Sequence, residues 1–546
     1  MRRRRFIGFS AAGMAGLAGC PAQPPDREGG PQHDSSEPTE ETPTENSTPT
    51  DSSAEEEEAR LLVDDIEIDP GRVEQARQVE ITVTVSNEGN AAGSESLSLL
   101  VDDAELTTVD VSLDPGETAE VTHAYRPGVV GEREVKLGER TATFEVSQYP
   151  AEFVTQDGPK FLVDGERYFF HGTSNDLLYR SPDWYLNEVL AEAQNIGLSA
   201  IRMVTIGVGP DAPDCDFNRC QQDRYSFMPE PGEFDDATFR QMDRVIYKAK
   251  QYGIRLVLPF VDNYAPSGMA QFVEWSDDAS RHDDFYTDPE CRRMYKEFVE
   301  GFLTRTNSYT GVEYRDDPTI LMWELANEPM AHGITEDGDG GDPAPEKLQS
   351  WIEEMSAFVK GIDSNHLLGT GGQGFYPDKL YHQDKGEDFI ANNRVEHIDC
   401  CSVHMYPKHW YEGEEDRVQN ASEKGRESIR VHTEDAHEVV EKPVYFGEFR
   451  PHTDIDRFSA DAEQKDGERA TILNNWYDAM DATNVDGAIH WTFFDPYDNE
   501  ENVVLTDRDE PLSEQYNGYH VVYPWDEATV STMRSYSETV REKSST

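Results

Sequence analysis

Two glutamates, Glu328 and Glu448, each stand at the end of a short, mostly apolar run. The first run, Thr319–Glu324, leads into an Asn-Glu-Pro sequence that contains Glu328, and the second run is Pro443–Gly447. Runs this short are typical of buried strands, and Pro329 prevents regular structure from continuing after the first one. Two carboxylates at the carboxyl ends of two buried strands are the groups that a barrel active site needs for general acid and nucleophile chemistry.

The elements that would position these acids form an alternating pattern over residues 149–546, where strand-like runs are followed by amphipathic, helix-like stretches such as Thr238–Tyr252 and Pro345–Ile362. Such alternation is typical of repeated βα units around a parallel sheet. Eight strands are expected, which fits an α/β fold of the (β/α)8 TIM-barrel type. They lie near Tyr168–Gly172, Ala200–Val204, Ile254–Val261, Thr319–Glu324, His366–Gly369, Cys400–His404, Val444–Gly447 and Gly487–Thr492.

Four further side chains stand at the expected strand ends. Arg202 lies inside an apolar strand, so burial should make it pair with a carboxylate, and Glu448 is the expected partner. His404 and Tyr406 leave the sixth strand on alternate positions, and the tyrosine could hold a nucleophilic carboxylate ionised through a hydrogen bond. Trp491 ends the eighth strand and offers an aromatic face to a sugar ring. Each of these residue types also occurs in barrel cores, so their joint position is the stronger signal.

Five stretches of this region resemble glycoside hydrolase family 5, and in particular its endo-β-1,4-mannanases. In chain order they are Asp284–Pro289, Asp317–Ile320, Trp323–Pro329, Gly374–Tyr376 and Ser402–Pro407. The resemblance implies a retaining hydrolase in which Glu328 is the acid/base, Glu448 the nucleophile and Asn327 a donor to the sugar 2-hydroxyl.

The resemblance also implies substrate-binding roles by position. Arg202, His404 and Tyr406 correspond to the residues around the nucleophile, Trp491 to the platform under the sugar that is cleaved, and Asn263 to an amide that the mannanases carry after the third strand. The implied chemistry requires a raised pKa for the acid and a low pKa for the nucleophile, which Arg202 and Tyr406 would supply. It requires no metal and no organic cofactor.

The chain departs from the mannanase pattern where the outer sugar-binding sites lie. Asp176, Leu177 and the segment Thr205–Gly209 stand where aromatic residues are expected, and Tyr264 stands in place of a tryptophan. Two alternatives to a mannan- or glucomannan-cleaving enzyme therefore stay open. A hydrolase of the same family directed at β-1,4-glucan would keep both catalytic acids, whereas a noncatalytic polysaccharide-binding surface protein would have no need of them.

The length and the net charge of the chain limit its domain organisation and its possible partners. At 546 residues it should form two or more domains. Its formal net charge of -61, from 109 acidic and 48 basic residues, argues strongly against a nucleic-acid partner. The simplest cause is a hydrated acidic surface suited to concentrated salt, so we expect a halophilic protein. Attraction of a cationic substrate is the alternative, but the acids are spread over the whole chain.

The first 59 residues have no globular pattern. Residues 1–20 combine four arginines, a short apolar segment and Leu17-Ala18-Gly19-Cys20, which resembles a twin-arginine export signal with a lipoprotein processing box. Lipidated Cys20 would then be the mature amino terminus and the only membrane contact. Residues 21–59 are rich in Pro, Ser, Thr, Asp and Glu and should form a disordered acidic tether. The expected location is the outer face of the cell membrane, anchored by lipid, or the medium.

Residues 60–148 return to short alternating strands, for example Ile81–Val85, Ser96–Leu100 and Thr143–Val146. Turn residues such as Asn87–Asn90 separate them, which predicts a small all-β sandwich. This region resembles the immunoglobulin-like adhesion modules that are often appended to archaeal surface enzymes. It has no evident aromatic strip for sugar binding, so a spacer is the favoured interpretation.

The remaining cysteines and one acidic loop add little. Cys215 and Cys220 share an expected loop and could form a local disulfide, whereas Cys400 and Cys401 should be small core residues of a strand. The loop at 336–342 has the acidic, glycine-rich character of a calcium loop but is not followed by a properly spaced glutamate. A solvated acidic loop is therefore the favoured interpretation.

Overall fold

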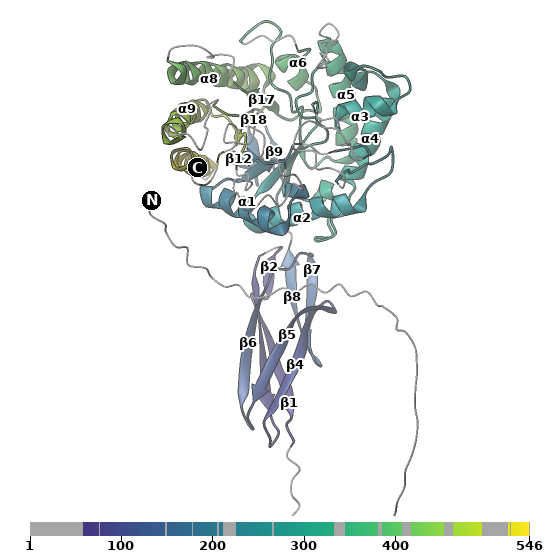
Figure 1. The fold of residues 1–546 in the computed structure, drawn as a ribbon, viewed down its shortest axis with the longest axis vertical. Coiled ribbons are helices and arrows are strands. Elements are labelled where there is room, and N and C mark those ends of the chain that lie inside the picture. Colours follow the sequence, from purple (N-terminus) through teal and green to yellow (C-terminus); the bar gives the residue numbers. More distant parts are fainter. Residues whose placement is uncertain are drawn as a thin grey trace, which may run out of the picture. The chain divides into compact units, whose positions relative to one another are not determined.

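The computed structural model contains an all-β region and, later in the chain, a barrel of parallel strands that helices surround (Figure 1). It describes residues 58–75, 77–147, 150–176, 178–204, 207–210, 225–264, 267–331, 344–380, 385–406, 416–451, 462–493, 522, 524 and 526–544. The expected signal and most of the tether, Cys215 with Cys220, and the acidic loop at 336–342 lie outside the described residues.

The all-β region consists of two sheets with one apolar core. One sheet holds β1 (Leu61–Asp69), β3 (Val79–Asn87) and β6 (Thr118–Tyr125), and the other holds β2 (Arg72–Glu74), β8 (Arg140–Ser147), β7 (Gly131–Leu137), β4 (Gly93–Val101) and β5 (Ala104–Leu113). Alternate residues of β3 are buried, so Ile81 and Val83 meet Val135 and Phe144 of the other sheet in the core. The predicted β-sandwich is therefore confirmed.

The eight strands of the second region are parallel and follow the order β16-β15-β14-β13-β12-β19-β18-β17. Gly369 at the end of β16 bridges to Cys400 just before β17, so the two outermost strands also meet and the sheet closes. The strands are β12 (Phe170–Ser174), β13 (Ala200–Arg202), β14 (Arg255–Pro259), β15 (Ile320–Glu324), β16 (Leu367–Gly369), β17 (Cys401–Met405), β18 (Val444–Phe449) and β19 (Gly487–His490). Each overlaps a predicted strand, which confirms the barrel.

The helices follow the strands and cover the outside of the barrel (Figure 1). They are α1 (Asp183–Ile196), α2 (Asp236–Tyr252), α3 (Met269–Trp275), α4 (Pro289–Leu303), α5 (Pro345–Ile362), α6 (Phe389–Asn393), α8 (Arg417–Glu434), α9 (Ala462–Thr483) and α10 (Glu527–Ser544). In α2 the Asp235 side chain accepts from two backbone amides of the first turn, and Gly253 ends the helix in a left-handed conformation. No helix within the described ranges is long and apolar enough to cross a membrane.

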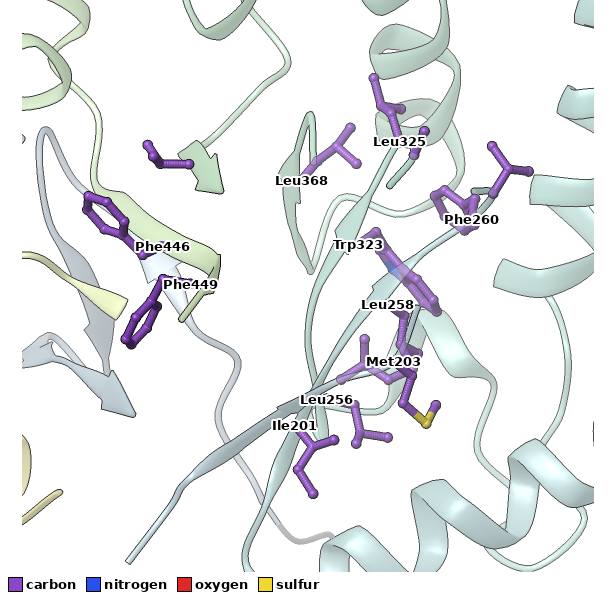
Figure 2. Packing of buried hydrophobic residues seen from close by; sticks show 14 of the residues in the cluster. Ile201, Met203, Leu256, Leu258, Phe260, Trp323, Leu325, Leu368, Phe446 and Phe449 are labelled. Carbon is purple, nitrogen blue, oxygen red and sulfur yellow. The ribbon is translucent and has the colours of Figure 1, made fainter. Parts of the chain in front are cut away.

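Side chains alternate between the two faces of the barrel wall. Ile201, Leu256 and Trp323 belong to the large apolar core formed by the outer face of the strands and the helices (Figure 2). The residues between them face the barrel interior, where an inner apolar cluster includes Ala200, Val257, Met322 and Tyr445. Cys400 and Cys401 are buried free thiols, as predicted for core residues.

The interior changes from apolar to charged along the strands. On β13 the inward residues are Ala200 and then Arg202, and on β15 they are Met322 and then Glu324. The apolar layer therefore closes one end of the barrel, and the buried polar groups collect at the carboxyl ends of the strands. This is the end at which (β/α)8 barrels carry their sites.

Candidate active site

Glu328 follows β15 and is held by its backbone. Its amide donates to the Gly371 carbonyl at 2.8 Å, and the preceding amide, of Asn327, donates to the Val261 carbonyl at 2.7 Å. Glu328 has φ of 49°, a left-handed conformation that residues with a side chain seldom adopt. Bonds to the ends of both neighbouring strands hold the carboxyl group in place despite this backbone conformation.

Arg202 is fully buried and joins three acceptors. Its Nη1 donates to Glu448 Oε1 at 2.6 Å, so the predicted pair is present. Its Nη2 donates to Glu324 Oε2 at 2.6 Å and to Asn327 Oδ1 at 2.8 Å. Glu324 was missed in the sequence, although an acid within an apolar strand is the same kind of signal that singled out Arg202. The Tyr445 hydroxyl donates to the other oxygen of Glu324 at 2.5 Å.

Glu448 is buried at the end of β18, where Tyr406 donates a short hydrogen bond to its Oε2. The expectation of a low pKa for this carboxyl is wrong. Burial raises the pKa of Glu448, and this outweighs the charge of Arg202 and the Tyr406 hydrogen bond, which both lower it. The predicted contacts are present, but they only reduce the increase in the pKa of Glu448.

Glu328 is buried beside Glu448 and has different partners. Its Oε1 lies 2.7 Å from His404 Nδ1, and its Oε2 accepts from Gln373 Nε2 at 2.5 Å. Burial raises the pKa of Glu328 to about 7, and the charge of Asp262 adds to this. The carboxyl group can therefore carry a proton near neutral pH, as a general acid must.

His404 was expected beside the nucleophile, but its Nδ1 lies closer to Glu328 (2.7 Å) than to Glu448 (3.7 Å). Burial lowers the pKa of His404 to about 4, so the imidazole is neutral at neutral pH. It therefore touches both carboxyl groups without adding a positive charge between them.

Three predicted substrate-binding residues surround this network. The Asn327 side chain donates to Asp262 Oδ1 at 2.8 Å, which fixes the orientation of its amide. Both polar atoms of the buried Asn263 amide lack a partner among the described residues, as expected of a group that awaits a ligand. Trp491 follows β19, is 9% exposed, and donates from its backbone to Phe449 at the end of β18.

Within the described ranges, one group of acidic, His or Cys side chains has ligand atoms close enough together to bind a single metal ion. It consists of Glu328, His404 and Glu448. These atoms lie within 4.8 Å of one another. The imidazole and one carboxyl group are already hydrogen-bonded to each other, and the pair of acids has the proximity that direct attack requires. The arrangement can therefore act on a glycosidic bond with its own side chains.

Residues 151–544 match the family model described as GH family 5 beta-mannosidase-like. The chain belongs to glycoside hydrolase family 5. Residues 58–140 match a second model, described as CARDB, within the β-sandwich.

Among relatives of this family 5 chain, mannan endo-1,4-beta-mannosidase 5 of Solanum lycopersicum is 32% identical over 357 residues, which cover 62% of this chain and 80% of the relative. Mannan endo-1,4-beta-mannosidase 2 of Arabidopsis thaliana is 35% identical over 317 residues, covering 54% and 68%. The crystal structure of the endo-1,4-beta-mannanase from Rhizomucor miehei aligns with a TM-score of 0.58 and 25% identity, covering 71% of this chain and 99% of that one.

The raised pKa of Glu328 predicts the alkaline limb of the pH profile. Because Glu328 must carry a proton to act as the acid, kcat/KM should fall as the pH rises through about 7. Asp262→Asn removes a charge that raises this pKa and keeps an oxygen that Asn327 can donate to, so the limb should move to lower pH. Glu463→Gln, at an exposed position of α9, should leave the limb in place. An unshifted limb in Asp262→Asn would contradict this account of the acid.

Proposed function

We propose that this protein is a retaining, endo-acting hydrolase of β-1,4-mannosidic bonds in mannan-type polysaccharides. The observation that carries the proposal is the pairing of Glu328 with Glu448. The two carboxyl groups leave different strands, approach within 4.8 Å, and have distinct partners. The names of the relatives support mannan as the substrate class, since both plant proteins are mannan endo-1,4-beta-mannosidases.

The chemistry follows from the two environments. In the first step Glu328 gives its proton to the glycosidic oxygen while a carboxylate oxygen of Glu448 bonds to the anomeric carbon. The carbon–oxygen bond to the leaving sugar breaks, and that sugar departs as an alcohol. In the second step Glu328 takes a proton from water, whose oxygen replaces Glu448 at the anomeric carbon. Each step inverts the configuration at the anomeric carbon, so the product has the same configuration as the substrate.

The distance between the acids supports this course over single displacement. Enzymes that invert hold their carboxyl groups roughly 6.5 to 9.5 Å apart, because a water molecule must fit between the base and the sugar. Here one oxygen of each carboxyl group lies within 4.8 Å of the other, which favours direct attack by Glu448. A noncatalytic binding protein would have no need for this buried pair and its supporting charges.

Replacement of each acid tests the proposal. Glu448→Ala should lose nearly all turnover, and azide should restore part of it with inverted product, because the anion attacks from the vacated face. Glu328→Ala should keep activity on substrates whose leaving group needs no proton, and azide should then give retained product. Wild-type enzyme should release reducing ends from mannan faster than from carboxymethylcellulose. Near-normal activity of Glu448→Ala would exclude the mechanism, and preference for the cellulose derivative would exclude the substrate.

We propose in addition that the protein is exported through a twin-arginine signal and anchored to the outer face of the membrane through lipid on Cys20. The basic start, the processing box around Cys20 and the tether-like composition of residues 21–59 support this location. Cys20→Ser should release the protein from membranes or leave the precursor unprocessed, as seen by fractionation and by the mass of the amino-terminal peptide. Ala22→Ser is the matched control. Membrane retention of Cys20→Ser equal to that of wild type would argue against lipidation.

The charge supports a third proposal, adaptation to concentrated salt. With a net charge of -61 the folded chain repels itself at low ionic strength, where the Debye length reaches about 30 Å at 0.01 M. Activity and Tm should therefore both rise from dilute buffer into molar NaCl. Sucrose at equal osmolality is the control, because it does not screen charge. A flat profile from dilute buffer to strong brine would exclude salt adaptation.

A further inference from the structure

The loop Gly371–Phe375 lies directly against the acid/base and contains a side chain that the mechanism above does not use. Gln373 Nε2 donates to Glu328 Oε2 at 2.5 Å and to the Tyr264 hydroxyl at 2.8 Å. An amide nitrogen is only a donor, so this contact favours the ionised form of the carboxyl group. Each carboxylate oxygen has two lone-pair sites, so Glu328 can keep this partner and still face a substrate.

The backbone of the same loop supports both groups beside the nucleophile. The Gly371 carbonyl accepts from the Glu328 amide at 2.8 Å, and the Gln373 carbonyl accepts from the His404 amide at 3.0 Å. Gly371 has φ of 70°, and a Cβ there would lie 1.8 Å from the Ala326 carbonyl oxygen, so only glycine allows this approach. The loop is therefore bound to the acid/base through its backbone as well as through its side chain.

A buried carboxyl group lies behind the loop. Glu387 is 6% exposed and accepts from the backbone amides of Gly374 at 2.9 Å and Phe375 at 3.3 Å. A Cβ on Gly372 would come within 2.4 Å of Glu387 Oε1, so the loop is closely packed against this carboxyl group. Burial raises the pKa of Glu387 to about 8, so its carboxyl group is protonated and neutral at mildly acidic pH.

We propose that Gln373 is a positioning residue that holds Glu328 for proton transfer, and that Glu387 acts through it by anchoring the loop. The inference rests on the proposed function, because it assumes that Glu328 is the acid/base. Gln373 favours the ionised form of Glu328, so it keeps the carboxyl group deprotonated and oriented for the second step, in which Glu328 must accept a proton from water. The charged and titratable groups that also face Glu328 are Arg202, Asp262, Tyr264, Glu387, His404 and Glu448.

Gln373→Leu tests the first part. Loss of the donor should raise the pKa of Glu328 and move the alkaline limb of kcat/KM to higher pH. On a substrate with an activated leaving group, where hydrolysis of the intermediate limits the rate, kcat below pH 7 should fall about tenfold, because a pKa raised by about one unit leaves less of Glu328 ionised to act as the base. Gln349→Leu removes a comparable Gln–Glu contact on the surface of α5 and should change neither quantity. An unshifted limb with unchanged kcat would overturn the proposal.

Glu387→Gln tests the anchor. The neutral side chain matches the protonated carboxyl group in size and keeps one oxygen that can accept from the backbone, so the variant should fold with a Tm near that of wild type. The amide has one acceptor oxygen in place of two, so one of the bonds to Gly374 and Phe375 is lost and the loop holds Gln373 less firmly. The pH limb should therefore move in the same direction as that of Gln373→Leu. The double variant should equal Gln373→Leu alone, because Glu387 acts through Gln373. Additive effects would show that Glu387 acts independently and would overturn the second part.

The outcomes separate this inference from the proposed function. If Glu448→Ala keeps near-normal activity, the assignment of the acid/base fails, and this inference fails with it. If Glu448→Ala and Glu328→Ala behave as proposed but Gln373→Leu has the pH profile of wild type, only the role of Gln373 fails. If Glu387→Gln does not fold, Gln373→Leu alone still decides that role.

Discussion

The site depends on one buried positive charge, the guanidinium of Arg202. A buried cation is costly unless acceptors compensate it, and here two carboxylates and an amide oxygen do so. Burial alone would lower the pKa of Arg202, but the charges of Glu324 and Glu448 outweigh this and raise it. Because Arg202, Glu324 and Glu448 come from three different strands, the network forms only when the barrel has closed. The complete site therefore exists only in the folded barrel.

The same burial gives the two acids their separate roles. Both Glu328 and Glu448 are desolvated, which raises both pKa values. Glu448 lies against the Arg202 charge and a tyrosine hydroxyl, whereas Glu328 lies beside a neutral histidine and near the negative charge of Asp262. Both acids are desolvated, so the difference between them comes from their neighbours. Glu328 is therefore the group that carries a proton near neutral pH. The contrast does not require the nucleophile to have an unusually low pKa.

The barrel wall explains why polar groups meet at one end. Inward positions recur every second residue, and apolar side chains occupy those nearest the amino ends of the strands. The next inward positions hold Arg202 and Glu324, which the apolar layer shields from water on one side. The loop Gly371–Phe375 covers the site on another side and brings the Gln373 amide to the acid. The same strands thus stabilise the fold through apolar side chains near their amino ends and carry the reactive groups near their carboxyl ends.

Local pattern in the sequence was enough to predict the eight strands, their order along the chain, the β-sandwich, and the two glutamates at strand ends, because periodicity and strand length are properties of short segments. It also predicted the Arg202–Glu448 pair, since a buried guanidinium must find an acid. Only the tertiary structure showed that Arg202 is shared with Glu324, that His404 is closer to Glu328, and that Gln373 reaches the acid. It also reversed the expected pKa shift of Glu448. These features arise from distances between segments far apart in the chain and from the total burial of each group, and neither is contained in any single stretch of sequence.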